Sequence, residues 1–157
     1  YVSESRSDFH PRHDAVSRSY RYQAFCDPLR HPLRERFAWR VWPAPKREVL
    51  QMAADLFLGV HDFAAFGSPM KPGGSTIREV VAVHWNHHDD LLEFEITANA
   101  FLYHMVRRLV FVQMKAAQGR LSMDELQHSL QDPQRTPIQG LAPAQGLRLE
   151  QVAYQQE

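Results

Sequence analysis

The segment from Ile96 to Arg120, ITANAFLYHMVRRLVFVQMKAAQGR, constrains the fold more than any other part of the chain. Its apolar residues cover most of the circumference of a helix, which predicts a helix over residues 101–118 that is buried on a broad front and ends at Gly119. Two adjacent arginines, Arg107 and Arg108, interrupt the apolar pattern. Removing an ion from water costs several kcal/mol, so we expect one of these guanidinium groups to have an anionic partner and Arg108 to extend outward on its long stem.

Alternating apolar and polar residues predict strands in four other segments. These strands cover residues 17–26, 76–85, 91–98 and 146–154. The second and third are joined by the polar turn 86–90, which predicts a hairpin.

Helical spacing of apolar residues predicts a second, amphipathic helix that begins at residue 46 and ends before Gly59. Ser122 and Glu125 have the spacing of a capping box, which predicts the start of a shorter helix that runs through Leu130. With 157 residues and 44% hydrophobic content, the chain can bury one ordinary core. We therefore predict a single domain over residues 1–157, of the α/β class (α+β type), with a mostly antiparallel sheet and helices packed on one face.

Composition narrows the class of protein further. We find no internal repeat and no low-complexity run, which argues against a solenoid or a linker. A single cysteine, Cys26, rules out an internal disulfide, and no signal peptide or bilayer-length apolar run is present, so we predict a soluble protein in a reducing, cytoplasmic setting with no membrane contact. We interpret Cys26 as a small buried hydrophobic residue and not as a nucleophile, because no activating base stands near it. The chain opens on Tyr1 and not on Met, so we expect that it was cut from a longer protein.

The charges sum to zero, but the first 50 residues carry an excess of positive charge. Arginines alternate there with aromatic residues, a mixture that is able to meet phosphates and to stack on bases. From charge alone, a solvated strand face would be the favoured interpretation. The residues concerned are Arg6, Arg12, Arg18, Arg21, Arg30, Arg34, Arg36 and Arg40, among Tyr20, Tyr22, Phe25, Phe37 and Trp39.

A group of potential metal ligands falls in the predicted hairpin turn. It comprises His84, His87 and His88 with Asp89 and Asp90. Its irregular spacing does not match a metal-binding motif, so we predict no metal site.

Five segments resemble, in order and spacing, the C-terminal half of bacterial tRNA pseudouridine synthase A. They are FHPRHDAVSRSYRY, GVHDFAAF, IREV, ANAFLYHMVRRLV and LAPAQGLRLEQVAY, and together they extend over nearly the whole chain. Several linked motifs are far more specific than one short pattern.

The resemblance implies an enzyme that isomerises uridine to pseudouridine in the anticodon stem-loop of tRNA, without cofactor or metal. Such an enzyme flips the base out of the stack and holds it beside an ionised carboxylate. The family's catalytic Asp lies in an Arg-Thr-Asp-x-Gly-Val-His motif of the N-terminal half, which this chain lacks. Asp14 and Asp62 match other segments, so we assign neither of them this role. The implied partners are tRNA, the N-terminal half of the same protein and a second copy in a homodimer, and the chain alone is expected to be inactive.

The resemblance also assigns residues. Arg107 matches the arginine that pairs with the catalytic Asp, so its partner would lie on the missing half. Tyr20 matches the tyrosine that stacks on the target base and is a candidate for moving the proton lost from the base carbon, whereas we assign Tyr22 to packing. Without the resemblance, Arg107 would be interpreted as a surface residue and both tyrosines as core aromatics. The residues predicted to bind substrate are Arg12, Arg21, His104 and Leu102.

Some positions depart from the family pattern. Pro11, Arg108 and Phe111 stand where the family usually has Ala, Asn and Gly. A bulky ring in place of a glycine changes how closely a helix approaches its neighbour, so packing at Phe111 should not be copied from relatives. The loop 66–76, rich in proline and glycine, is predicted to be mobile.

Two alternative functions stay open. One is a non-catalytic RNA-binding module that shares the fold, and the other is an α/β interaction domain with no RNA role. The first would bind tRNA without a second domain, and the second would not bind tRNA at all.

Overall fold

A computed structural model describes residues 8–132 and 138–154 of the chain, so that Arg6 of the basic group lies outside the described residues. The elements follow one another as β1 (Ala15–Cys26), η1 (Arg34–Arg36), β2 (Trp39–Val41), α1 (Arg47–Asp55), β3 (Gly59–Asp62), β4 (Ile77–His88), β5 (Leu91–Ala98), α2 (Met105–Ala117), α3 (Met123–Gln131), η2 (Ala144–Gly146) and β6 (Leu147–Tyr154).

The six strands form one sheet, in which five follow the order β2-β1-β5-β4-β3 and β6 also pairs with β1. Strand β1 is long enough to pair along one edge with two partners, β6 through its first part and β2 through its last three residues. Among the described strands, the β1–β2 pair is parallel and the other pairs are antiparallel. The predicted hairpin is β4 and β5, which turn at Asp89 with a positive φ of 55°.

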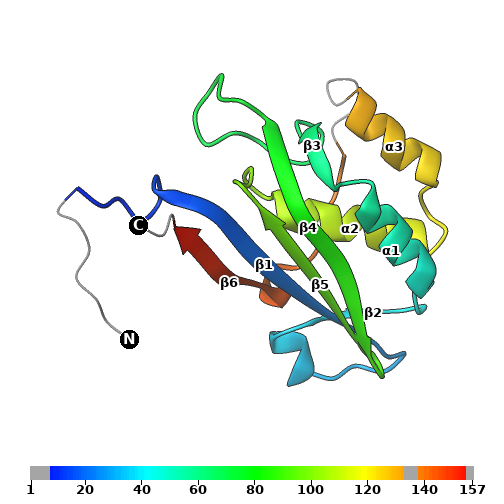
Figure 1. The fold of residues 1–157 in the computed structure, drawn as a ribbon. Coiled ribbons are helices and arrows are strands. Elements are labelled where there is room, and N and C mark those ends of the chain that lie inside the picture. Colours follow the sequence, from blue (N-terminus) through cyan, green and yellow to red (C-terminus); the bar gives the residue numbers. More distant parts are fainter. Residues whose placement is uncertain (1–7, 133–137, 155–157) are drawn as a thin grey trace.

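One face of the sheet is buried under the helices and the other is open. On β5, Leu92, Phe94 and Ile96 are almost fully buried, while Glu93 and Glu95 of the opposite face are only half-buried. Figure 1 shows α2 crossing behind the long strands, with α1 beside it. The predicted fold class, a mostly antiparallel sheet with helices on one face, is confirmed.

Helix α2 is the centre of the core, and it differs from the prediction at its start. It begins at Met105 and not at residue 101, because His104 has the left-handed conformation (φ 65°), which a right-handed helix cannot contain. Its end is as predicted, since Gly119 takes the left-handed conformation (φ 71°) that stops a helix. The fully buried Gln113 accepts a hydrogen bond from the indole of Trp85 (2.8 Å), so this polar side chain is satisfied inside the core.

The shorter elements are a mixture of confirmed and missed predictions. Helix α3 begins after Ser122 with the predicted capping box, in which the Ser122 hydroxyl accepts from the Glu125 N–H (3.1 Å) and the Ser122 N–H donates to the Glu125 carboxylate (2.8 Å). Helix α1 ends earlier than predicted, at Asp55, because the chain soon forms β3 along the edge of β4. Strands β2 and β3 were not predicted. Within the described residues, no helix is long and apolar enough to cross a membrane.

Candidate active site

A cleft of about 760 Å³ opens where the N-terminal end of α2 faces β1 and the start of β4. Five of the six residues predicted to act in catalysis or substrate binding line it. They are Tyr20, Arg107, Arg12, His104 and Leu102.

Arg107 is held at the edge of the cleft by a two-way contact with the segment that precedes β6. Its Nε donates to the carbonyl of Ala142 (2.7 Å), and the N–H of Ala142 donates to the carbonyl of Arg107 (3.2 Å). This anchor fixes the stem of the side chain and leaves the two Nη groups at the end of the fork. No carboxylate in the described part of the chain lies within ion-pair distance of Arg107.

The two tyrosines of β1 lie on the same face of the sheet but have different surroundings. Tyr20 lines the cleft, with its ring edge-on to that of Phe101 at a centroid distance of 5.0 Å. Tyr22 is fully buried, and its hydroxyl donates to the carbonyl of Pro143 (2.7 Å). Burial raises the pKa of Tyr22 well above its usual range, and the nearby charge of Arg107 opposes this only in part. Tyr22 therefore packs, as predicted, while Tyr20 faces the cleft.

His104 lies at the start of α2 in a strained conformation. A left-handed backbone is uncommon for a residue other than glycine, and such strain is concentrated at functional sites. The imidazole stacks on the ring of Tyr103 with a centroid distance of 3.7 Å. Burial, and then the charges of Arg107 and Arg108, lower the pKa of His104. The ring therefore offers the cleft a neutral aromatic face.

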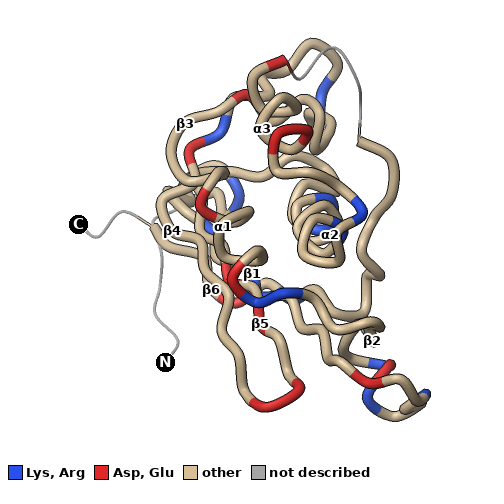
Figure 2. The backbone as a smooth tube through the Cα atoms, turned by 90° about the vertical axis from the view of Figure 1, so that its right-hand side faces the viewer, with Lys and Arg blue, Asp and Glu red and all other residues tan. Residues whose placement is uncertain are grey.

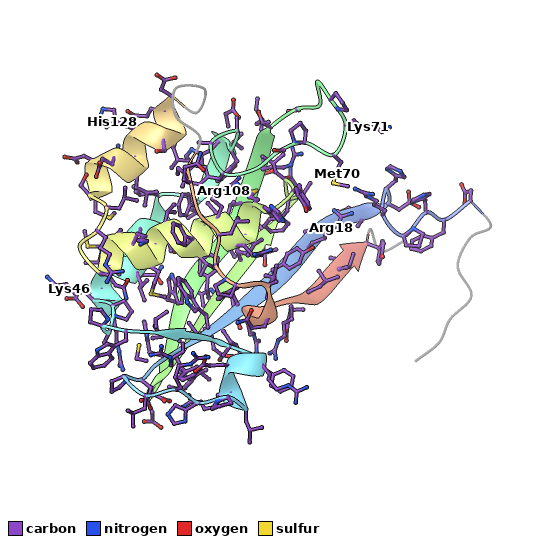
Figure 3. The ribbon with its side chains drawn as sticks, turned by 180° about the vertical axis from the view of Figure 1, so that it is seen from behind. Arg18, Lys46, Met70, Lys71, Arg108 and His128 are labelled. Carbon is purple, nitrogen blue, oxygen red and sulfur yellow. The ribbon has the colours of Figure 1, made fainter. Side chains whose placement is uncertain are left out.

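The first residues of the loop 66–76 are fixed against the cleft. Ser68 and Tyr103 form an isolated antiparallel bridge, in which the Tyr103 N–H donates to the Ser68 carbonyl (2.9 Å). Gly67 permits this approach, because a Cβ there would lie 2.6 Å from the Cβ of Leu102. Figure 3 shows the loop reaching toward β1, and Met70 of the loop and Arg18 of β1 both line the cleft.

The charge of the cleft is of one sign. Its lining includes Arg12, Arg18, Arg78 and Arg107, and neither Asp nor Glu is present among the lining residues. Figure 2 shows the same bias on α2, where basic residues occur without acidic ones. An uncompensated group of guanidinium charges favours an anionic ligand.

Arg21 is the one predicted site residue that the structure does not bring to the cleft. Because successive residues of a strand point to opposite faces, Arg21 lies on the open face of the sheet. There its guanidinium forms a close ion pair with Glu95 (2.7 Å) and longer ones with Glu150 (3.4 Å) and Glu93 (3.8 Å). The geometry gives no support to a substrate contact by Arg21.

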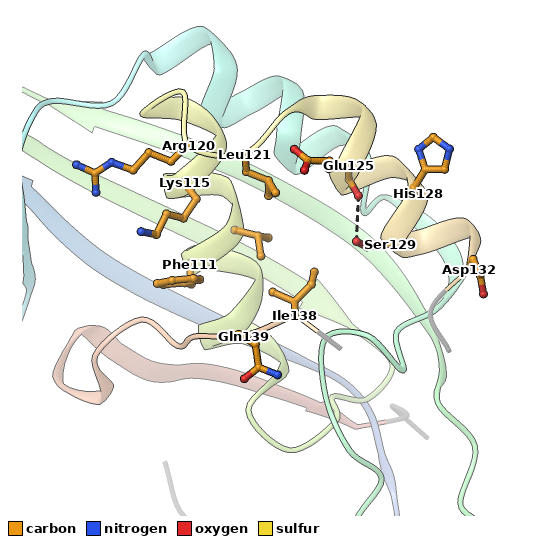
Figure 4. Close-up of a pocket in the computed structure, with 11 residues that line it drawn as sticks. Phe111, Lys115, Arg120, Leu121, Glu125, His128, Ser129, Asp132, Ile138 and Gln139 are labelled. Carbon is orange, nitrogen blue, oxygen red and sulfur yellow. Dashed lines mark hydrogen bonds between the residues drawn. The ribbon is translucent and has the colours of Figure 1, made fainter. Parts of the chain in front are cut away.

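A second hollow of about 770 Å³ lies between α2 and α3 (Figure 4). Basic Lys115 and acidic Glu125 both line it, and it contains none of the predicted site residues. At its edge the ring of Phe111 packs so closely on the backbone that a Cβ at Gly140 would meet it at 2.4 Å. Phe111 is thus accommodated by the passing glycine, which is a local arrangement and not a feature of the cleft.

The possible metal ligands and Cys26 do not form a reactive site. His84 contacts Glu95 (3.0 Å), and His88 lies 4.0 Å from Glu93. Over residues 8–132 and 138–154, no group of three or more His, Cys, Asp or Glu side chains is placed to hold a metal ion. Burial raises the pKa of the Cys26 thiol, which keeps it protonated and unreactive.

Several residues that line the cleft were not identified from the sequence. Arg18 could have been found, since it lies two residues before Tyr20 and therefore on the same face of β1. Arg78 lies within the matching segment IREV at the start of β4, but it was not among the predicted site residues. The other unpredicted lining residues include His13, Met70, Asn99, Tyr103 and Leu147.

The fold and the cleft define a small α/β domain suited to hold an anionic ligand against an aromatic wall. A family model described as tRNA pseudouridine synthase matches residues 53–155. The chain belongs to the tRNA pseudouridine synthase family.

Individual relatives agree with the family model. The chain is 38% identical to a tRNA pseudouridine synthase A of Methylacidiphilum infernorum over 148 residues, which cover 94% of this chain and 58% of the relative. It is 33% identical to proteins of the same name from Citrifermentans bemidjiense, over 96% of this chain and 60% of the relative, and from Pelobacter propionicus, over 98% and 63%. The chain thus spans about three fifths of the length of these curated relatives.

Proposed function

We propose that the protein containing this chain is a tRNA pseudouridine synthase that isomerises uridine to pseudouridine in the anticodon stem-loop. In this proposal the chain supplies one wall of the active site, and the nucleophilic aspartate comes from a part of the protein outside these 157 residues. The observation that carries the proposal is that Arg107 is hydrogen-bonded to the carbonyl of Ala142 in a cleft that has no acidic lining residue.

Arg107 suits the task of holding a catalytic carboxylate. Its charge is permanent, and the two Nη groups at the end of its planar fork can bind both oxygens of a carboxylate at once. Because Nε is already bonded to Ala142, a bound carboxylate would be held in one orientation. The nearby positive charge would also keep it ionised beside an apolar wall.

Tyr20 suits the task of holding the flipped base. Its aromatic ring lines the cleft, and the ring of Phe101 packs against it in a T-shaped contact. Isomerisation breaks the bond from the sugar to the ring nitrogen and forms a bond to a ring carbon, which then loses its proton. In this proposal the phenol hydroxyl of Tyr20, at the cleft wall, moves that proton.

The other lining residues complete the pocket. The buried side chain of Leu102 provides an apolar wall, and the stacked rings of Tyr103 and His104 provide a second aromatic surface. A flipped base needs both kinds of surface, because it gives up its stacking neighbours when it leaves the helix. Homodimer formation and a cytoplasmic location also belong to the proposal, and they rest on the family resemblance alone.

The test is pseudouridine formation in an unmodified tRNA transcript. We expect the full-length protein to be active and the 157-residue chain to be inactive. In the full-length protein, Arg107→Ala should lower turnover about a hundredfold or more, as removal of one preorganised charged contact does elsewhere, and should leave tRNA binding largely in place. Arg107→Lys should restore little, because it keeps the charge but not the fork.

A matched control is Arg30→Ala, since Arg30 is exposed and paired with Glu35 away from the cleft. The proposed site is wrong if the chain alone is active, or if Arg107→Ala is tolerated as well as the control. If the full-length protein binds tRNA but forms no pseudouridine, the non-catalytic RNA-binding module is the correct alternative.

A further inference from the structure

Eight arginines of the chain fall into two groups according to the atoms that hold them, and Arg47, outside the cleft, also bonds to a main-chain carbonyl, that of Asp89 (2.8 Å). One group bonds to carboxylates and the other, in the cleft, bonds only to main-chain carbonyl oxygens within the described residues. The first group comprises Arg21, Arg30, Arg34, Arg40 and Arg148. The second comprises Arg18, Arg78 and Arg107.

This difference matters because a carbonyl oxygen orients a guanidinium without cancelling its charge. Arginines of the first group are already neutralised, and they have no need of a ligand. The guanidinium groups of the second group are held in a fixed orientation by carbonyl oxygens, and their charge is not compensated. They lie in a cleft whose lining has no acidic residue. Arg107 has an assigned partner in the proposed catalytic carboxylate, which leaves the charges of Arg12, Arg18 and Arg78. Of these, Arg18 and Arg78 are oriented by main-chain carbonyl oxygens.

Arg18 lies beside the proposed base-binding position. It is two residues from Tyr20 on the same face of β1, which places their Cα atoms about 7 Å apart along the strand. Its guanidinium donates to the carbonyls of Asn99 (3.3 Å) and Arg12. Both bonds are to main-chain atoms at the rim, so the group is held at the cleft surface.

Arg78 lies at the start of β4, two strands away from Arg18. Its Nη1 donates to the carbonyls of Ser75 (3.0 Å), in the preceding loop, and of Ile77 (2.6 Å), its neighbour in β4. Its Nε is buried and has no hydrogen-bond partner among the residues that the structure describes. Burial lowers the pKa of Arg78, which is the sign of a charge that is partly removed from water without compensation. The Nε groups of Arg21 and Arg40 are also buried without a hydrogen bond, so what distinguishes Arg78 is that its guanidinium has no carboxylate partner among the described residues.

We propose that Arg18 and Arg78 bind two backbone phosphates of the RNA strand in the cleft, one on each side of the nucleotide that is held against Tyr20. Phosphate oxygens are strong acceptors for a guanidinium fork, and a strand that passes over the ring of Tyr20 carries one phosphate before and one after the flipped nucleotide. The two arginines therefore position the strand and take no part in the chemistry. The inference rests on the proposed function for the identity of the RNA.

The first experiment measures tRNA binding by the full-length protein at salt concentrations from about 50 to 200 mM. The variants are Arg18→Gln, Arg78→Gln and the double variant, with Arg30→Gln as the control. Each cleft variant should lose about tenfold in affinity, and the slope of log K against log salt should become shallower by about 0.7 to 0.9 per removed contact. At saturating tRNA, turnover should stay within about twofold of wild type while KM rises.

The second experiment locates the contacts. A set of stem-loop RNAs, each with one neutral methylphosphonate in place of a backbone phosphate, is bound to wild type and to each variant. Arg18→Gln should weaken the binding of these RNAs except one, in which the phosphate that Arg18 contacts is already neutral. Arg78→Gln should show the same exception for a different RNA. If the loss from each substitution and the loss from each neutral phosphate add in full at every position, the inference is overturned.

Two further outcomes would also overturn it. The first is a salt slope that is unchanged in the cleft variants or changed equally by Arg30→Gln. The second is a fall in melting temperature of the cleft variants with an unchanged salt slope, which would show that carboxylates elsewhere in the protein hold these arginines. The proposed function fails separately, if Arg107→Ala leaves pseudouridine formation intact while the salt slopes still change.

Discussion

A hydrogen bond from Tyr22 to Pro143 tethers β1 to the segment before β6, and the substitution Tyr22→Phe removes the hydroxyl group that donates it. The Tyr22 ring is fully buried, and its hydroxyl donates to the carbonyl of Pro143 at 2.7 Å. Phenylalanine fits the same space, so the packing of the ring is preserved. What is lost is the hydrogen bond, and the partly buried carbonyl of Pro143 is left without this donor.

The expected magnitude follows from that change. Leaving a buried acceptor unpaired costs about 1–3 kcal/mol, and the partial exposure of Pro143 places this case near the lower end, at about 1.5 kcal/mol. For a domain of this size, this lowers the melting temperature by about 5 °C. Thermal unfolding of wild type and variant, followed by circular dichroism, measures the difference directly.

Tyr20→Phe is the matched control on the same strand. The Tyr20 ring lines the cleft, and its hydroxyl has no hydrogen bond to any described residue, so stability should change by less than about 0.5 kcal/mol. Under the proposed function, turnover should fall about a hundredfold or more, because the proton from the base carbon loses its carrier. Equal melting temperatures for Tyr22→Phe and wild type would refute the tether, and full activity of Tyr20→Phe would refute the proton role.

Two other outcomes test the packing and the charge network. Gly146→Ala should destabilise the fold by about 2 kcal/mol in urea unfolding, because a Cβ there would lie 2.6 Å from a main-chain carbonyl oxygen and 2.7 Å from the ring of Tyr22; an unchanged unfolding midpoint would contradict this close approach. The hydrogen bonds from Arg34 lower the pKa of Asp90 below its usual 3.8, so the ionised carboxylate stabilises the fold above that pH and this contribution is lost as the pH falls through the lowered pKa. Asp90→Asn should therefore be less stable than wild type at pH 7, by less than about 1 kcal/mol, and the gap should close on acidification; a gap that widens in acid would show that the sign is wrong.

The regular parts of the fold were predictable because their signals are local. The alternation in β1, β4 and β5 and the capping box of α3 each depend on residues that are neighbours in the sequence. Strand β2 has three residues, and it exists because the chain returns to pair in parallel with the end of β1. Nothing within those three residues predicts that return. The start of α2 was placed too early because a left-handed His104 leaves no mark on the hydrophobic pattern.

The residues of the candidate site also divide into those that could be predicted from the sequence and those that could not. Motif matching nominated Tyr20 and Arg107, and the fold brings both to one cleft. The same matching nominated Arg21, for which a period of two already indicates the opposite face of the strand. Arg78 lies in the matching segment IREV on β4, but that the start of β4 borders the cleft depends on the pairing of β4 with β5 and of β5 with β1.

The segment from Ala142 to Gly146 explains how two distant parts of the sequence form one site. Ala142 fixes Arg107 of α2 through two hydrogen bonds, and Pro143 accepts one from Tyr22 of β1. Gly146 lets the same segment pass against β1 where any side chain would collide. Since Tyr20 lies two residues from Tyr22 on the same strand, this connection helps to set its position relative to Arg107. A change that loosens the segment should therefore lower activity without touching either cleft residue, and the loss of turnover in Tyr22→Phe should exceed what its stability alone would explain.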